Sequence, residues 1–208
     1  MFFLNYATLI DPLLRGIRLH TIDFSGMKAG DRVLDVCCGT GDQAFYYAEA
    51  GIMATGIDLD PNMLKLTGKD KRKQGSSNVS FQIADARNLP FKDNFFDYAS
   101  ICFALHEKER TARDKIISEM KRVVKKDGAL IFIDFQAPLP KNRWLYLIKV
   151  IEFIAGRNHF RYFKDYIGQG GLDEILKKNQ LCEEKRDYLN DGLITIIKTE
   201  NPKDVYQG

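Results

Sequence analysis

A glycine-rich stretch, GTGDQA at residues 39–44, directly follows an apolar run that predicts a buried strand. Two glycines in a tight strand-to-helix turn let the backbone approach a ligand closely. Asp58 ends a second predicted strand, at the separation from the glycines at which a carboxylate accepts hydrogen bonds from both ribose hydroxyls. These residues indicate a site for an adenosine-containing ligand, and they fit a nicotinamide dinucleotide as well as other ligands of that class.

Each of these features also has a purely structural explanation. An ordinary tight turn selects glycine because glycine tolerates positive φ angles. Asp58 comes shortly before Pro61, which suits the first position of a helix, so a role as helix N-cap competes with ribose binding. The glycines and Asp58 therefore need support from other residues.

Two further aspartates narrow the class of ligand. Asp35 lies inside the first predicted strand, where a carboxylate is costly unless it has a partner, and a ligand ammonium group near the carboxyl edge of the sheet would be one. Asp85 follows the third predicted strand, where it could accept a hydrogen bond from an adenine amino group. A solvated turn is the alternative for Asp85. The two residues favour a ligand that carries both an ammonium group and adenine.

The elements that must position these residues alternate between strand and helix patterns. Strands are predicted over 32–37, 53–58, 79–84, 97–103 and 129–135, and helices over 42–50, 61–69 and 111–126. Asp127-Gly128 is expected to end the last of these helices. The alternation predicts βαβ units, and therefore a parallel sheet with helices on both faces.

The end of the chain breaks this alternation. Strand patterns over 183–189 and 192–200 are separated only by Asn190-Asp191, a link too short to cross over a sheet, so these strands must be antiparallel. Before them, the apolar segment 143–156 predicts a helix that covers the sheet, caps a lipophilic acceptor, or touches a membrane or a partner chain. The stretch 69–78 is predicted to be a charged helix end and a surface loop.

Composition bounds the class of protein. A chain of 208 residues and 23.8 kDa suits one domain, and a net charge of +3 is too weak to argue for a nucleic-acid partner. The 4 cysteines, two of them adjacent, lack the spacing of a metal site, so we expect reduced thiols in a cytoplasmic protein and no metal. No signal peptide is expected, and no apolar run approaches the roughly 18 residues of a membrane span.

Five motifs then occur in a characteristic order: VLDVCCGTGD, GIDLDPNML, ADARNLPF, NFFDYASICFALHE and GALIFIDF. Their order and spacing resemble the sequential motifs of class I S-adenosylmethionine-dependent methyltransferases over about residues 31–135. A weaker similarity in NYATLIDPLLRG and HFRYFKDYIGQGGLDEILKKNQL resembles the ubiquinone/menaquinone-biosynthesis C-methyltransferase family. The resemblance implies an α/β fold: a single Rossmann-like methyltransferase domain whose mostly parallel, seven-stranded sheet ends in an antiparallel C-terminal hairpin strand.

The resemblance also implies a role for each motif residue toward S-adenosyl-L-methionine. The methionine portion would be held by Asp35, Gly39 and Gly41. Asp58 would bind the ribose, and Leu59 and Met63 would pack on the adenine ring, whose edge Asp85 and Ala86 would contact. Phe103 would form the floor of the pocket, and Tyr6 would contact the cofactor from an N-terminal lid.

The implied organisation is an N-terminal helical lid (1–30), a cofactor-binding core (31–135), an acceptor-side cap (136–180) and a C-terminal hairpin (181–200). The implied activity is in-line methyl transfer to a small, apolar or aromatic acceptor such as a quinone precursor. An NAD-dependent oxidoreductase and a non-catalytic partner subunit that binds S-adenosylmethionine are the alternatives. No nucleic-acid partner is expected, and peripheral membrane contact is compatible with the apolar segment.

Methylation of a phenol or enol carbon requires a base. His106 is the predicted base, because it lies just beyond the fourth strand and its unperturbed pKa suits neutral pH. A structural histidine is the alternative for His106, and His20 and His159 carry no motif. An aromatic-rich region after the fifth strand is predicted to wall the acceptor pocket through Trp144, Tyr146, Phe153, Phe160, Tyr162, Phe163 and Tyr166.

Overall fold

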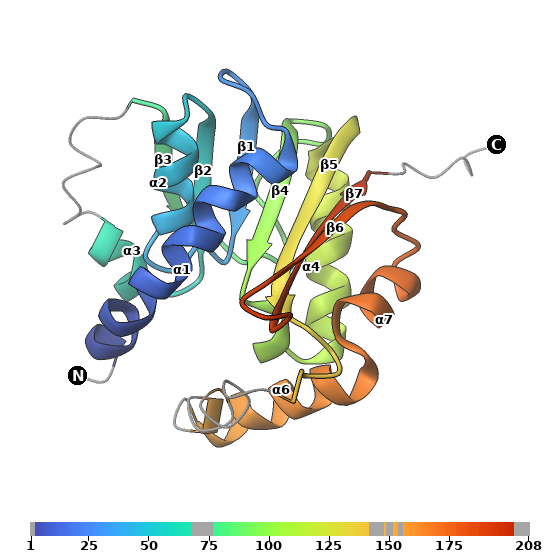
Figure 1. Ribbon diagram of the computed structural model, residues 1–208. Coiled ribbons are helices and arrows are strands. Elements are labelled where there is room, and N and C mark those ends of the chain that lie inside the picture. Colours follow the sequence, from blue (N-terminus) through green and yellow to red (C-terminus); the bar gives the residue numbers. More distant parts are fainter. Residues whose placement is uncertain (1–2, 68–76, 142–147, 149–151, 154–155, 202–208) are drawn as a thin grey trace.

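The described strands form one seven-stranded sheet in the order β3-β2-β1-β4-β5-β7-β6 (Figure 1). They are β1 (Arg32–Val36), β2 (Met53–Asp58), β3 (Val79–Ile83), β4 (Phe96–Cys102), β5 (Val124–Phe135), β6 (Glu183–Leu189) and β7 (Ile194–Glu200). The pairs among β1 to β5 are parallel, whereas β7 is antiparallel to both of its neighbours. The predicted, mostly parallel sheet with an antiparallel hairpin strand is confirmed.

The computed structural model describes residues 3–67, 77–141, 148, 152–153 and 156–201, and side chains from residue 14 onward within those ranges. Most of the predicted loop at 69–78 and most of the apolar segment 143–156 lie outside the described residues.

The C-terminal hairpin turns through residues that tolerate positive φ angles. Asn190, Asp191 and Gly192 have φ values of 51°, 56° and 79°, and the Leu193 N–H donates to the Asn190 carbonyl at 3.2 Å. The link is therefore longer than the predicted Asn190-Asp191 pair, and β7 begins at Ile194. Asparagine, aspartate and glycine are the residue types that adopt this conformation most readily. β6, whose first five residues are charged, forms one edge of the sheet.

Helices cover both faces of the sheet. The helices are α1 (Phe3–Ser25), α2 (Asp42–Glu49), α3 (Pro61–Thr67), α4 (Arg110–Val123), α6 (Arg157–Gln169) and α7 (Gly171–Lys178), with a 3-10 turn, η2 (Leu105–Glu107). One core cluster joins α4 and α7 to one face of the sheet, and a second joins α1 and α2 to the opposite face. Figure 1 shows α1 crossing in front of the sheet and α6 below the lower strand ends.

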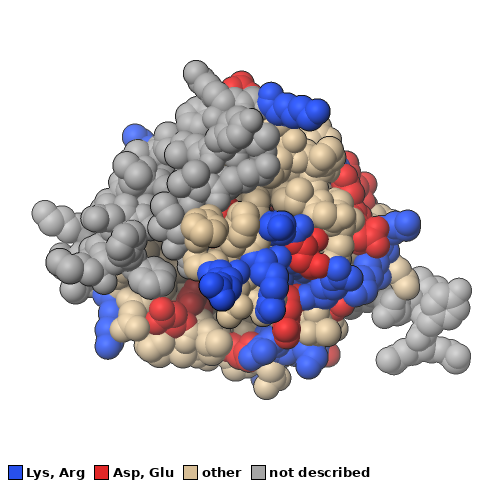
Figure 2. Space-filling view, turned by 90° about the horizontal axis from the view of Figure 1, so that it is seen from below, with Lys and Arg blue, Asp and Glu red and all other residues tan. Residues whose placement is uncertain are grey.

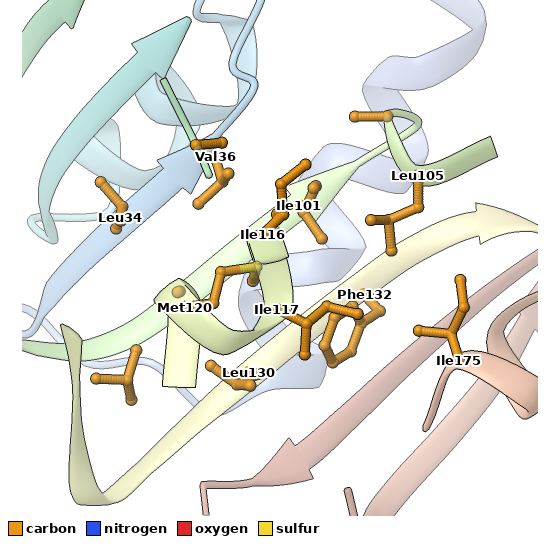
Figure 3. Close-up of a cluster of buried hydrophobic side chains, with 14 of the residues drawn as sticks. Leu34, Val36, Ile101, Leu105, Ile116, Ile117, Met120, Leu130, Phe132 and Ile175 are labelled. Carbon is orange, nitrogen blue, oxygen red and sulfur yellow. The ribbon is translucent and has the colours of Figure 1, made fainter. Parts of the chain in front are cut away.

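The core beneath α4 follows from strand alternation and helical periodicity. Leu34 of β1 and Leu130 of β5 point to the same side, where they meet Ile116, Ile117 and Met120 of α4 (Figure 3). All five side chains are at most 2% exposed. The spacing of the three helix residues places them on one face of the helix, as the sequence predicted.

The junction between α4 and β5 differs from the prediction. The helix was expected to run to residue 126, but it ends at Val123 and β5 begins at Val124. Val124 pairs with Phe96 of β4 and is fully buried. The Asn201 side-chain amide donates to the carbonyls of Lys121 and Val124, both at 2.9 Å. Because a distant residue satisfies these carbonyls, the helix can stop before the Asp127-Gly128 signal.

The surface carries mixed charge. On the face seen from below Figure 1, the described Lys and Arg side chains lie beside Asp and Glu (Figure 2). Within the described part of the chain, no helix combines the length and the hydropathy that crossing a bilayer requires.

Candidate cofactor and acceptor site

A cavity of about 860 Å³ opens at the carboxyl ends of β1, β2 and β4. It is lined by the turn after β1, by residues after β2 and β3, by the segment after β4 and by one side of α1. Its lining includes most of the predicted cofactor residues, namely Asp35, Gly39, Asp58, Leu59, Met63, Asp85, Ala86 and Phe103. In open α/β sheets, ligands bind in the crevice at this edge, where the strand order reverses.

Asp35 places a buried carboxylate in the wall of this cavity. The residue is 1% exposed, and its Oδ1 accepts a hydrogen bond from the Ser100 hydroxyl at 3.2 Å. Its Oδ2 is buried and has no partner at hydrogen-bond geometry among the described residues, and the backbone N–H of Ala44 also interacts with the carboxylate. Burial raises the pKa of Asp35 to about 7, against smaller opposing effects of Ser100 and the Arg18 guanidinium. A carboxylate oxygen left free in this way is suited to a ligand cation.

Asp58 holds the glycine turn from the end of β2. Its Oδ2 accepts a hydrogen bond from the Gly39 N–H and its Oδ1 from the Asp60 N–H, both at 2.9 Å. The alternative role of Asp58 as helix N-cap is wrong, because Asp60 caps α3: its Oδ1 accepts the Asn62 N–H at 2.8 Å, and of the amides there Asp58 bonds only the N–H of Asp60. A carboxylate oxygen accepts more than one hydrogen bond, so these contacts leave capacity for ribose hydroxyls.

The two glycines of the turn are required for different reasons. Both have positive φ angles, 55° at Gly39 and 82° at Gly41. A Cβ on Gly41 would lie 2.5 Å from the Phe81 ring, whereas a Cβ on Gly39 would meet nothing within 4 Å. Gly41 is therefore fixed by packing beneath the turn. Gly39 lines the cavity, where a methyl group would take up ligand space.

Asp85 already has a cationic partner. Its Oδ2 lies 2.7 Å from Nη2 of Arg87, and its Oδ1 accepts from the Arg87 N–H at 2.9 Å. These hydrogen bonds from Arg87 lower the pKa of Asp85. Ala86, between the two, is 8% exposed and lines the cavity, so its backbone is available at this edge.

The remaining predicted residues surround the same space. Leu59 is 60% exposed and Met63 is half-buried, and both line the cavity. Phe103 adopts a positive φ of 50° directly after β4, held by a hydrogen bond from its N–H to the Ile133 carbonyl at 2.8 Å. The side chain of Tyr6 lies outside the described residues.

The lining also holds charged groups that were not predicted to bind a ligand, among them Arg18, Lys108 and Glu107. Arg18 of α1 lies 3.6 Å from Asp42 and faces the side of the cavity that holds Asp35. Lys108 and Glu107, after β4, form an ion pair at 2.5 Å. His106 made the segment after β4 a candidate part of the site. No sequence pattern indicated Arg18, because α1 reaches the cavity only through packing.

His106 is buried behind the cavity wall. It is 4% exposed and is absent from the cavity lining, although Ala104 and Glu107 on either side of it in the chain line the cavity. Its Nδ1 lies 2.6 Å from Oδ1 of Asp134, and its Nε2 lies 3.7 Å from Oε2 of Glu152. The nearby carboxylates raise the pKa of His106 to about 9, although burial acts in the opposite direction. Its role as a base stays a prediction.

The predicted aromatic wall is mostly elsewhere. Of its described members, only Tyr162 lines the cavity. Phe153 is exposed, Phe160 packs against the second core cluster, and Phe163 and Tyr166 are buried in the two core clusters. The Tyr166 hydroxyl donates to the Phe135 carbonyl at 3.0 Å, which fixes it in the core. The prediction was wrong for Phe163 and Tyr166, because α6 turns these two residues toward the sheet. Trp144 and Tyr146 lie outside the described residues.

All four thiols are free. Burial raises the pKa of Cys37 to about 12, and it also raises the pKa of Cys38 and of Cys102 above the usual range. Because the thiolate is the reactive form, these cysteines are suited to packing rather than to nucleophilic chemistry.

Comparison with known proteins gives a family and a fold. A profile of the ubiE/COQ5 methyltransferase family matches residues 14–166. "Ubiquinone/menaquinone biosynthesis C-methyltransferase UbiE" of Pseudomonas aeruginosa (strain LESB58) is 42% identical over 144 residues, which cover 64% of this chain and 55% of that protein. The protein of the same name from Psychromonas ingrahamii is 36% identical over 206 residues, covering 89% of this chain and 81% of the relative.

Solved structures agree on the fold. A SAM-dependent methyltransferase from Aquifex aeolicus aligns with a TM-score of 0.65 at 20% identity and covers 88% of each chain. Phosphoethanolamine N-methyltransferase 2 of Haemonchus contortus, solved in complex with S-adenosyl-L-methionine, aligns with a TM-score of 0.69 at 19% identity, over 91% of this chain and 53% of that one. The expected Rossmann-like methyltransferase fold is confirmed.

Proposed function

Because this chain belongs to the ubiE/COQ5 methyltransferase family, we propose that it transfers a methyl group from S-adenosylmethionine to a small aromatic acceptor. The relatives named above are all methyltransferases, so they lend no support to a nicotinamide-dependent oxidoreductase or to a non-catalytic partner subunit. The chain spans about half the length of the Pseudomonas relative that it matches, so the acceptor is proposed for this chain on its own residues.

The observation that carries the proposal is the free oxygen of Asp35. This buried oxygen has no partner at hydrogen-bond geometry among the described residues, and it lies in the cavity wall next to the turn that Gly39 opens. A carboxylate there is suited to the α-ammonium group of S-adenosylmethionine. A nicotinamide dinucleotide would bring pyrophosphate to the same turn, and the charge of Asp35 opposes an anion.

Different residues would bind different parts of the cofactor. Asp35 and the backbone at Gly39 would hold the methionine portion, and Asp58 would accept hydrogen bonds from the ribose hydroxyls. Leu59 and Met63 would cover the adenine ring, with the backbone at Ala86 and the carboxylate of Asp85 at its edge. When bound, S-adenosylmethionine supplies a methyl group made electrophilic by its sulfonium.

Catalysis would come mainly from positioning. The wall after β4 would hold the acceptor in line with the methyl group, since bringing two reactants into line in a closed site contributes several kcal/mol, up to roughly 7–11. Phe103 and Tyr162 supply apolar surface there, and the Lys108–Glu107 pair supplies polar groups. This mixture suits an aromatic ring that carries oxygen substituents, such as a quinone precursor. An acceptor without polar groups would leave the charged pair without a role.

The test has two stages. Calorimetric titrations with S-adenosylhomocysteine and with NADH should show binding of the first, and binding of NADH alone would refute the proposal. The purified chain, S-adenosylmethionine with a labelled methyl group and a panel of hydroxylated aromatic acceptors should then yield a labelled product. Cofactor binding without transfer to any acceptor, in a preparation that gains activity when a second protein is added, would support the partner-subunit alternative.

The site of methylation decides whether a base is needed. A carbon acceptor must lose a proton, whereas a phenolate oxygen can react directly. The label should therefore be located on the product by NMR. If it is on carbon, His106→Ala should lower turnover strongly with cofactor affinity unchanged, and full turnover would remove His106 from the reaction.

A further inference from the structure

Three side chains from separate parts of the chain meet behind the acceptor side of the cavity: His106 of η2, Glu152, and His159 of α6. Nε2 of His159 lies 2.5 Å from Oε2 of Glu152, and Nε2 of His106 lies 3.7 Å from the same oxygen. Each residue offers a ligand atom within 4.8 Å of the others. From this arrangement we propose that the three residues bind one divalent first-row transition-metal ion, with Zn²⁺ as the best match.

The donor set has the chemistry of a transition-metal site. Two imidazole nitrogens and one carboxylate oxygen are ligands that Zn²⁺ and Fe²⁺ accept, whereas Mg²⁺ and Ca²⁺ prefer oxygen ligands only. Ligand atoms of a tetrahedral Zn²⁺, at about 2.0–2.1 Å from the ion, lie roughly 3.3 Å from one another. The observed separations of 2.5 Å and 3.7 Å bracket that value. The ring centroids of the two histidines, 5.6 Å apart, are also close to the roughly 5 Å that a shared ion would give.

Each histidine has a second carboxylate on its other ring nitrogen. Nδ1 of His106 lies 2.6 Å from Oδ1 of Asp134, which also accepts the Phe135 N–H at 2.8 Å. Nδ1 of His159 lies 3.4 Å from Oε2 of Glu107. The hydrogen bond to Asp134 fixes the tautomer of His106 and turns its Nε2 toward the ion, and Glu107 lies on the corresponding side of His159 at ion-pair distance. Most histidines that bind metals have such a partner. Two unrelated histidines with this support and a common third ligand are hard to explain by packing alone.

The buried carboxylates around these three residues also favour a bound cation. Glu152 is 1% exposed and Asp134 is 1% exposed, and Glu107 adds a third carboxylate beside them. Lys108 pairs with Glu107 on the cavity side. Among the described residues, the imidazoles are the ion-pair partners of Glu152 and Asp134, and the Arg113 guanidinium also acts on Asp134. A divalent cation between the imidazoles would balance this charge. The 2.5 Å contact requires a proton between His159 and Glu152, and the ion would take its place and release that proton to solvent.

An ion here would connect three parts of the acceptor side. It would join η2, Glu152 and α6, and Glu107 and Tyr162, which flank these ligands in the chain, line the cavity. The ion would therefore fix the wall against which the acceptor packs. No sequence pattern indicates this site, because His106, Glu152 and His159 lack the spacing of a metal motif and meet only in the folded chain. The proposal does not depend on the cofactor or on methyl transfer. It replaces the predicted role of His106 as a base, because an imidazole whose Nε2 binds the ion and whose Nδ1 faces Asp134 has no nitrogen left to accept a proton.

The test uses the untagged full chain, freed of metal with a chelator and titrated with Zn²⁺ by calorimetry. One Zn²⁺ per chain should bind, and the melting temperature should rise by several degrees. Co²⁺ should give the intense visible absorption of a four-coordinate site. Glu152→Gln and His159→Phe should each weaken Zn²⁺ binding at least 10-fold, and His159→Phe, at a partly exposed position, should still fold.

Matched controls sit on other parts of the surface. His20 also pairs with a carboxylate, Asp187, at 2.9 Å, and Glu184 pairs with Lys198 at 2.9 Å. His20→Phe and Glu184→Gln should bind Zn²⁺ like the unchanged chain. No stoichiometric binding, or equal binding by His159→Phe and His20→Phe, would overturn the proposal.

Discussion

The carboxylate of Asp58, at the end of β2, accepts a hydrogen bond from the backbone N–H of Gly39, in the turn after β1, at 2.9 Å. One side chain thus sets the shape of the turn that borders the cavity and stands ready for a sugar hydroxyl. The structure of the turn and the affinity for a nucleoside ligand therefore depend on the same two oxygens.

Replacing Asp58 should separate these effects from general stability. Asp58→Ala should weaken S-adenosylhomocysteine binding roughly 10- to 100-fold, because hydrogen bonds to a charged group contribute about 1.5–3 kcal/mol. Calorimetry measures the change. The matched control is Asp31→Ala, which also removes a carboxylate that accepts a backbone N–H, that of Lys28 at 2.7 Å, but outside the cavity. Unchanged affinity in Asp58→Ala would remove this residue from the site.

Asp35 should make ligand-free stability and cofactor affinity respond to pH in opposite directions. Its pKa of about 7 in the folded protein lies above the unfolded value of about 3.9. The folded state therefore retains a proton that the unfolded state loses, and the ligand-free protein loses stability as pH rises from about 4 to 7. Affinity for a cationic cofactor should rise over pH 6 to 8, as the carboxylate ionises.

Asp35→Asn tests both halves of that argument. It should raise the melting temperature of the ligand-free protein at pH 8 by a few degrees and should weaken cofactor binding at least 10-fold, with little dependence on pH. Asp97→Asn is the control, because hydrogen bonds from Lys125 and the Arg32 backbone lower the pKa of Asp97. That variant should lose stability and keep its cofactor affinity. A destabilised Asp35→Asn would contradict the prediction.

Gly39 should be sensitive to ligand binding rather than to packing. Gly39→Ala and Gly192→Ala both place a side chain at a positive φ with no atom within 4 Å of the new Cβ. Each should cost about 1 kcal/mol of unfolding free energy through backbone strain, measured by urea denaturation. Gly39→Ala alone should also weaken S-adenosylhomocysteine binding. Equal affinities in the two variants would show that the Gly39 Cβ position lies outside the ligand's space.

Arg113 should stabilise the acceptor side far more than its neighbour Arg110 does. Arg113 is 3% exposed and donates to the carbonyls of Leu105 and Tyr162 at 2.9 and 3.1 Å, and its Nη1 lies 3.2 Å from Asp165. Arg113→Met leaves buried acceptors unpaired and should cost about 2–4 kcal/mol.

Arg110→Met is the control for that variant, because Arg110 pairs with the same Asp165 but is exposed. It should cost less than about 1 kcal/mol. Chemical denaturation of both variants measures the difference, and equal losses would show that the buried hydrogen bonds of Arg113 contribute nothing special.

The parts of the fold that sequence predicts are those governed by local pattern. The apolar run through Leu34 and the turn at Gly39 gave the first strand and its ligand edge, because burial on both faces and positive φ angles each restrict residue choice. The end of α4 was wrong because its carbonyls are satisfied by Asn201, which is 77 residues from Val124. No pattern near residue 124 contains that information.

The residues of the candidate site also separate into those that local sequence pattern predicts and those that only tertiary packing brings together. Asp58 and Asp85 were found because they end or follow a strand, and Asp35 was found because a carboxylate inside a buried strand needs a partner. Parallel strands bring their carboxyl ends to one edge. Arg18 was missed because its position depends on how α1 packs. His159 carried no motif at all, and its position depends on how α6 packs against η2.

The five consecutive charges that open β6 have a consequence for the protein in concentrated solution. A strand at a sheet edge presents unpaired backbone groups to which another chain can add a strand. On β6, side chains such as Glu184 and Lys185 keep that rim hydrated, with Glu184 bound to Lys198 and Lys185 above the Phe24 ring. A second molecule would have to strip water from these charges before its backbone could pair. The edge that completes the fold thereby discourages the growth of fibrils from it.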